Sequence, residues 1–166
     1  MGSASDDVFS LPDVAFRPVS PRLVPMRRTA YVLLIVPVTV GLALLLGLTV
    51  AGWLALLVVG LAVVALGWGW VALGRTARSW AYAERADDLL IVHGVLIRRL
   101  VVVPYGRMQL VDVHVGPLDR AFGLARVQLH TAAATTDAHI PGLEPAEATV
   151  LRERLAALGE ARSAGL

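Results

Sequence analysis

The stretch AYVLLIVPVTVGLALLLGLTVAGWLALLVVGLAVVALGWGWVAL, residues 30–73, decides the fold because it contains no Asp, Glu, Lys, Arg or His. As a single helix it would extend about 66 Å at about 1.5 Å per residue, whereas a bilayer core is about 30 Å thick and takes about 20 residues. Two spans fit and one does not. β-Branched residues and glycine cluster at residues 49–52. We therefore expect a transmembrane hairpin with helices at about residues 30–50 and 53–73.

Two other interpretations of this block are less favoured. Arg27 and Arg28 before an apolar run resemble a twin-arginine or Sec signal, but the run far exceeds a signal core of about 7–15 residues. A buried hairpin in a soluble protein would show a polar face with helical periodicity, and none exists here. Hydrophobic residues make up 57% of the chain and charged residues 17%, which also favours a membrane protein over a soluble domain.

Small residues recur at every fourth position toward the end of the first span and just beyond it, at Ala43, Gly47 and Ala51. Such a ridge allows two helices to approach closely. We expect it to pack the first span against the second, and contact with another protein is the alternative.

Arginines flank the hairpin on both sides. Arg22, Arg27 and Arg28 precede the first span, Arg75 and Arg78 follow the second, and the connecting turn is uncharged. Because cytoplasmic flanks retain the Lys/Arg excess, we expect a multi-pass protein of the cell membrane with both termini and the following domain in the cytoplasm. The same five arginines are candidates for contact with anionic lipid headgroups, in addition to their role in fixing the topology.

From residue 80 onward the pattern changes to short strands separated by turns. We expect six strands, at residues 80–84, 89–93, 95–103, 109–115, 125–132 and 138–140. A helical turn is expected at residues 118–124, a polar turn at 133–137, a chain break at Pro141-Gly142 and a helix from Glu144 or Pro145 to about Leu158. The proline-rich residues 1–29 should be extended or disordered, and residues 159–166 should form a flexible tail.

A set of motif positions follows the hairpin: Pro104, Tyr105, Arg107, Gln109, Gly116, Pro117, Arg120, Phe122, Gly123, Pro141 and Gly142. With the hairpin, these positions resemble YdbS-like bacterial membrane proteins that carry a bacterial pleckstrin-homology (PH)-like domain, and the resemblance covers about residues 20–158. It implies an α+β membrane protein in which the two-helix transmembrane hairpin is followed by a mostly β PH-like half-barrel, at residues 80–158, with a C-terminal helix.

The half-barrel that the resemblance implies has about seven strands, one more than the residue pattern predicts. The missing strand could come from splitting residues 95–103 or from an earlier start of the domain. The resemblance also implies a complex with a larger multi-pass membrane protein that carries related domains.

Side chains that carry catalysis are scarce. The chain has no Cys, residues 86–162 contain no Ser, and the threonines lack an activating pattern. Four histidines, at positions 93, 114, 130 and 139, stand at no recognised metal-ligand spacing. We therefore expect no enzyme, no cofactor and no metal site. The positive charge gathers at the membrane edges and not on one face of the domain, which argues against a nucleic-acid partner.

Two functions remain for a tethered β domain without catalytic groups. The first is a non-enzymatic interaction or scaffold module, whose sheet edge or helix groove docks a membrane-protein partner or a second copy. The alternative is a sensor or binder of anionic lipid headgroups at the cytoplasmic face. A small-molecule ligand is left open.

Overall fold

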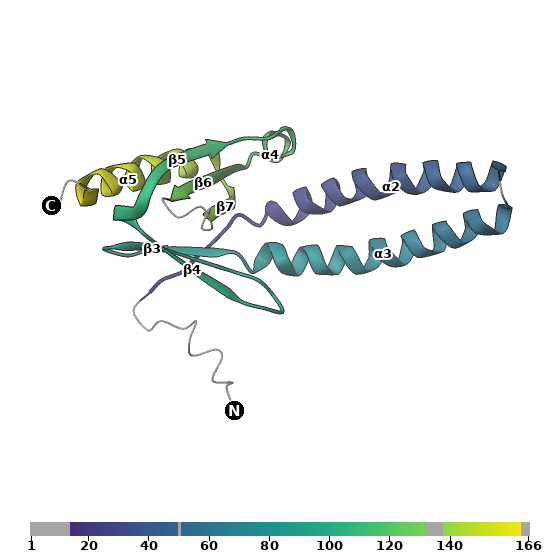
Figure 1. Cartoon of the computed structure of the whole chain (residues 1–166), viewed down its shortest axis with the longest axis horizontal. Coiled ribbons are helices and arrows are strands. Elements are labelled where there is room, and N and C mark those ends of the chain that lie inside the picture. Colours follow the sequence, from purple (N-terminus) through teal and green to yellow (C-terminus); the bar gives the residue numbers. More distant parts are fainter. Residues whose placement is uncertain (1–13, 50, 132–137, 164–166) are drawn as a thin grey trace, which may run out of the picture.

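The computed structural model describes residues 14–49, 51–131 and 138–163. Figure 1 shows two long helices side by side, extending from one end of a body made of two sheets and a C-terminal helix. In chain order the elements are β1 (Arg17–Pro18), α2 (Leu23–Thr49), α3 (Gly52–Arg78), β2 (Ala81–Glu84), β3 (Asp88–His93), β4 (Arg99–Pro104), the 3-10 turn η1 (Tyr105–Arg107), β5 (Met108–His114), α4 (Pro117–Ala121), β6 (Ala125–Thr131), β7 (Ala138–Leu143) and α5 (Pro145–Ser163).

Helices α2 and α3 are each long and apolar enough to cross a membrane. Their large apolar side chains face outward, with Leu48 85%, Leu56 75% and Trp68 76% exposed. A surface of this kind suits hydrocarbon and would be costly in water.

The two helices pack against each other through small residues and polar contacts. The Tyr31 hydroxyl of α2 donates to the Ala65 carbonyl of α3 at 2.9 Å. A Cβ added at Gly47 would lie 3.4 Å from the Cβ of Ala55. The small-residue ridge of α2 therefore faces α3 at this position, as expected for packing within the hairpin.

Both helices extend beyond the uncharged block toward the sheets. Helix α2 begins at Leu23 and α3 ends at Arg78, so the expectation of an extended chain is wrong for residues 23–29. The physical reason is burial, because Leu23, Val24 and Met26 are covered by the domain and a helix can continue once its apolar face has somewhere to pack. Residues 1–13 lie outside the described part of the chain.

The sheets are antiparallel, with strand orders β1-β2-β3-β4 and β5-β6-β7. Strand β1 pairs with β2 through Arg17↔Tyr82 and Pro18↔Ala81. Two residues later, the Ser20 N–H donates to the carbonyl of Gly142 in β7 at 2.8 Å. The segment before α2 thus joins the two sheets and supplies a strand that the residue pattern missed. The helical hairpin is inserted between β1 and β2, so the domain is not confined to residues 80–158.

Two strands differ from their expected bounds by three or more residues at one end. Strand β4 begins at Arg99, and residues 94–98 form the loop of the β3–β4 hairpin. Strand β7 continues through Pro141-Gly142, so the expected chain break there is wrong. Gly142 has a φ of +73°, and the β6–β7 register shifts between Ala125 and Val127. Such an irregularity tolerates a proline, which has no N–H to donate to the ladder. The turn expected at residues 133–137 lies outside the described residues.

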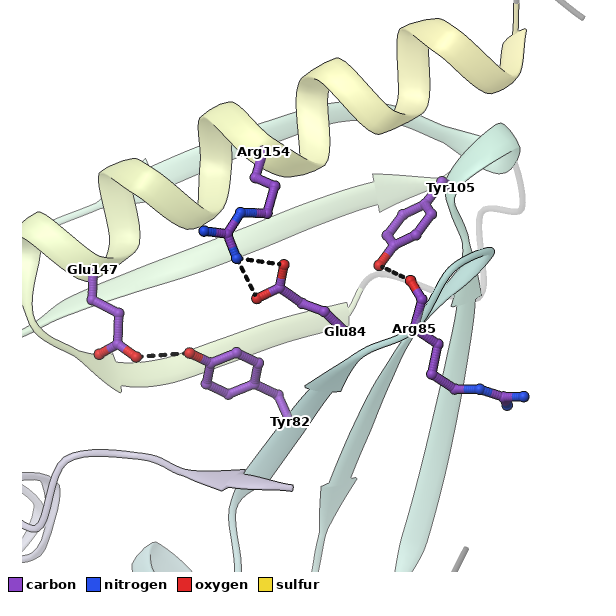
Figure 2. Close-up of polar contacts among 6 residues, drawn as sticks. All are labelled: Tyr82, Glu84, Arg85, Tyr105, Glu147 and Arg154. Atoms are coloured by element: carbon purple, nitrogen blue, oxygen red, sulfur yellow. Dashed lines mark hydrogen bonds and ion pairs between the residues drawn. The ribbon is translucent and has the colours of Figure 1, made fainter. Parts of the chain in front are cut away.

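Helix α5 closes the body over a core that includes the fully buried Leu129, Ile140 and Leu155. Figure 2 shows how the helix is tied to β2: the Tyr82 hydroxyl donates to Glu147 at 2.7 Å, and Arg154 donates to both oxygens of Glu84 at 3.1 and 3.2 Å.

The last turn of α5 is also held by the body. Arg162 forms an ion pair with Asp87 and donates to the Ala86 carbonyl at 3.3 Å. These contacts explain why the helix continues to Ser163 and not only to about Leu158. The expectation of a flexible tail is therefore wrong for residues 159–163, and residues 164–166 lie outside the described part of the chain.

Candidate functional site

The five arginines singled out in the sequence lie where the helices meet the sheets. Arg27 and Arg28 are in the first turns of α2, and Arg75 and Arg78 are in the last turn of α3. Because α2 and α3 run antiparallel, these four lie at the same end of the pair (Figure 1). Arg22 precedes α2 and lies 3.9 Å from Glu144, with both side chains 60% exposed, so this pair contributes little to stability.

Arg28 packs across the hairpin. Its guanidinium lies 4.4 Å from the centroid of the Trp70 ring, and its Nε donates to the Trp70 carbonyl at 3.2 Å. A Cβ added at Gly74 would lie 2.7 Å from an Arg28 nitrogen. Arg28 therefore links the start of α2 to the end of α3. This structural role is separate from any contact with lipid.

An aromatic and basic cluster, formed by Arg27, Trp80, His93 and His139, lies at the base of the domain. Trp80 stacks on His93 with ring centroids 4.5 Å apart and contacts His139 at 5.0 Å. The Arg27 guanidinium lies 5.9 Å from the Trp80 ring. No local sequence pattern marks this cluster, because its members come from α2, the α3–β2 junction, β3 and β7.

Both histidines of the cluster are held in the neutral form. Desolvation lowers the pKa of His93 below its ordinary value of 6.5, and Arg99 lowers it further. Desolvation likewise lowers the pKa of His139, with added repulsion from Arg126, His93 and Arg27. The unfolded chain therefore takes up these protons at a higher pH than the folded chain does, so the stability present above pH 6.5 is lost as the pH falls through the folded pKa values.

We accordingly expect the thermal midpoint of the full chain in detergent to fall between about pH 7 and about pH 5 more steeply than in the double variant His93→Gln/His139→Gln. The partial exposure of both rings keeps the difference modest. Comparing wild type with the variant removes the shared contribution of the carboxylates. Parallel pH profiles for the two proteins would contradict the assignment.

A groove of about 490 Å³ opens beside the end of α3. Arg75, Arg78 and Arg98 line it, together with residues of the β3–β4 hairpin, including Val95. The structure thus brings two of the predicted lipid-contacting arginines together with Arg98, from the loop before β4.

The family motif positions are structural for the most part. Tyr105 is fully buried, and its hydroxyl donates to the Arg85 carbonyl at 2.9 Å (Figure 2). Burial also raises the pKa of Tyr105, so the hydroxyl stays protonated and available to donate. Pro104 ends β4, and Arg107 closes η1 on the exposed surface.

The positions around α4 shape a turn at the base of the domain. The Gly116 N–H donates to Asp119 at 3.1 Å, and Pro117 occupies the first helical turn. Gly123 follows with a φ of +65°, a conformation that glycine adopts without strain. Phe122 packs against the core, whereas Arg120 is exposed. These residues set the path of the chain and converge on no reactive group.

A second surface lies between β5 and α5. It is a groove of about 730 Å³ whose walls include Gln109, Leu110 and Asp112 from β5 and Arg152 and Ala156 from α5. Among the described strands, β5 is at the edge of its sheet and pairs only with β6. None of its side chains is buried, and Leu110 is 54% exposed. An open strand edge beside a helix is the geometry that binds extended peptides by strand addition.

Among the described residues, no three His, Cys, Asp or Glu side chains converge on a metal site. His114 lies opposite Arg126 in the β5–β6 ladder, whereas His130 lies opposite Leu110 and near Asp112, at 3.9 Å. The two histidines on these strands are therefore not cross-strand partners.

Comparisons with known proteins point in one direction. A family model described as the bacterial PH domain matches residues 29–159. The UPF0699 transmembrane protein YdbS of Bacillus subtilis (strain 168) is 38% identical over 79 residues, which make up 48% of this chain and 48% of that protein. The chain thus spans about half the length of the curated relative it matches. No solved structure matches this chain.

Proposed function

Because the chain belongs to the bacterial PH domain family, we propose that it is a non-enzymatic, membrane-anchored interaction module that docks a segment of a larger multi-pass membrane protein. The observation that carries this proposal is the open edge of β5 beside the β5–α5 groove. A strand added there would satisfy outward-facing backbone groups, which edge strands otherwise leave to solvent.

In this proposal both helices span the cell membrane, and both chain ends and the PH-like domain lie in the cytoplasm. The arginines at the domain end of the helical pair support this orientation, since cytoplasmic flanks retain positive charge. The uncharged turn around residues 49–52 is the part that reaches the other side. A tethered domain meets other membrane proteins at a raised local concentration, which suits an assembly role.

The residue inventory supports a non-catalytic role. The chain has no cysteine, and residues 86–162 contain no serine. The buried core contains only apolar side chains and tyrosines among the residues that the structure describes. A perturbed acid or base facing a pocket would favour catalysis. The two histidines with lowered pKa values pack against Trp80, so their pKa shifts have a structural cause.

The test is photo-crosslinking in the native membrane, with a crosslinking amino acid in place of Leu110 in β5 and, as the matched control, in place of Val102 in β4. Both are apolar strand residues, 54% and 45% exposed, but they lie on different sheets. We expect a crosslink from position 110 to a membrane protein with related domains, and none from position 102. Equal crosslinking from both positions, or none from position 110, would contradict the docking proposal.

A second function, binding of anionic lipid headgroups, is favoured by Arg75 and Arg78 beside Arg98 in one groove. Each arginine near an anionic surface contributes about 1 kcal/mol, or about fivefold in affinity. If this function holds, residues 14–28 joined to residues 75–163 by a flexible linker, which keeps Arg75 and Arg78, should bind anionic vesicles more tightly than neutral ones. The double variant Arg75→Gln/Arg78→Gln should weaken that binding by about 30-fold, and added salt should weaken it as well. Equal binding to both vesicle types would exclude it.

A further inference from the structure

The loop of the β3–β4 hairpin carries an apolar tip, defined as Val95, Leu96 and Ile97. These side chains are 45%, 99% and 72% exposed. Three consecutive exposed apolar residues in a turn are disfavoured in water unless they serve a contact. No described part of the chain covers Leu96.

The apolar tip lies close to the point where α3 ends. The Gly94 N–H, at the start of the loop, donates to the Ser79 hydroxyl at 3.0 Å, and Ser79 caps the C-terminal end of α3. At about 3.3 Å per extended residue, the tip is within about 10 Å of Gly94. Figure 1 shows the hairpin loop pointing in the direction in which α2 and α3 leave the domain.

The loop is held in this direction by its first residue. Gly94 has a φ of +108°, and a Cβ there would collide with the Ile97 carbonyl oxygen. The strands are paired up to His93↔Arg99, which leaves a short loop with little freedom to fold back. The tip is therefore presented at a fixed position relative to the end of α3.

Charge around the loop matches a bilayer interface. Arg75 and Arg78 of α3 and Arg98 of the loop line one groove, which Val95 also lines. Arginines at headgroup depth next to apolar side chains that reach the acyl chains are the arrangement of interfacial membrane segments. A protein partner at this place would have to share the space with the lipid that surrounds α3.

We propose that the apolar tip inserts into the bilayer leaflet from which α3 emerges, with phospholipid as its partner. The insertion gives the domain a membrane contact additional to its two helices and fixes the tilt of the sheets above the membrane. The inference rests on the proposed spanning of the bilayer by α2 and α3.

The test uses single cysteines in the full chain, which has no cysteine of its own. Leu96→Cys, Leu34→Cys in α2 and Glu153→Cys in α5 each carry a polarity-sensitive fluorophore after reconstitution into phospholipid nanodiscs with nitroxide-bearing acyl chains. Leu34 is 63% exposed on a helix, and the Glu153 side chain is 65% exposed on the body. We expect several-fold stronger quenching at position 96 than at position 153, and strong quenching at position 34.

The outcomes separate the two proposals. Quenching at position 34 but not at position 96 overturns insertion and leaves the helices in the bilayer. Weak quenching at both positions overturns insertion and the proposed spanning together. A blue-shifted label at position 96 that lipid nitroxides do not quench indicates a protein contact, and also overturns insertion.

A second variant tests whether the apolar side chains drive the contact. With the label at Val95→Cys, the added changes Leu96→Ser and Ile97→Ser should reduce lipid quenching several-fold while leaving the thermal midpoint unchanged, because both side chains are exposed. Unchanged quenching would mean that the tip is near lipid only because α3 is, and would overturn the proposal.

Discussion

A fragment of residues 80–163 is expected to remain unfolded, although it contains β2 to β7 and α5. The domain core also contains Val19, Leu23, Val24 and Met26, which precede the hairpin. Each buried apolar side chain contributes about 1.5–3 kcal/mol, so the four contribute about 6–12 kcal/mol, against a total of about 5–15 kcal/mol for a typical domain. The fragment would also lose the Ser20 hydrogen bond that joins the two sheets.

The matched control joins residues 14–28 to residues 75–163 with a short flexible linker. The ends to be joined lie on facing turns of the two packed helices, where the Arg28 side chain reaches Gly74. We expect this joined domain to unfold cooperatively and to show dispersed amide resonances, whereas the fragment should show neither. A cooperative transition of equal midpoint in both would contradict the insertion of the hairpin between β1 and β2.

The second large effect is expected for Tyr105→Ala, with a loss of about 3–5 kcal/mol in the free energy of unfolding. Tyr105 is fully buried where β4 passes into η1, and its hydroxyl donates to the Arg85 carbonyl at 2.9 Å. Its own N–H donates to the Asp87 carbonyl at 3.1 Å. The ring therefore fills the core beneath α5 while its two donors hold the turn between β2 and β3.

Tyr105→Phe separates these roles, because it keeps the ring and removes the hydroxyl. We expect it to cost about 1 kcal/mol. Denaturant unfolding of the joined domain measures both variants, with Val102→Ala on the exposed face of β4 as the neutral control. If Tyr105→Ala proved no more costly than Tyr105→Phe, the ring would not be part of the core as described.

The fold class predicted from the sequence is confirmed: the chain is an α+β membrane protein with two long apolar helices and a PH-like domain closed by a C-terminal helix. The resemblance to YdbS-like proteins is confirmed by the family match and by the Bacillus subtilis relative. These features were predictable because each depends on residues that are close in the sequence. The charge-free run at residues 30–73 indicates the helices, and the alternation at residues 109–115 indicates a strand.

Features that depend on distant contacts were not predictable in the same way. Strand β1 has two residues, including a proline, and becomes a strand only by pairing with Ala81 and Tyr82 across the inserted hairpin. The cluster around Trp80 unites side chains from separate elements. The residue pattern predicts a strand at residues 95–103, which includes the apolar tip, because hydrophobicity alone does not distinguish a buried strand from an exposed apolar loop.

The orientation of the helical hairpin is tested most directly by labelling intact cells with a membrane-impermeant maleimide. The chain has no cysteine, so Ala51→Cys reports on the helix turn and Glu153→Cys on the domain, with the wild type as the blank. We predict labelling of Ala51→Cys in intact cells, and labelling of Glu153→Cys only after the membrane is permeabilised. Labelling of Glu153→Cys in intact cells would contradict a hairpin that leaves its domain in the cytoplasm.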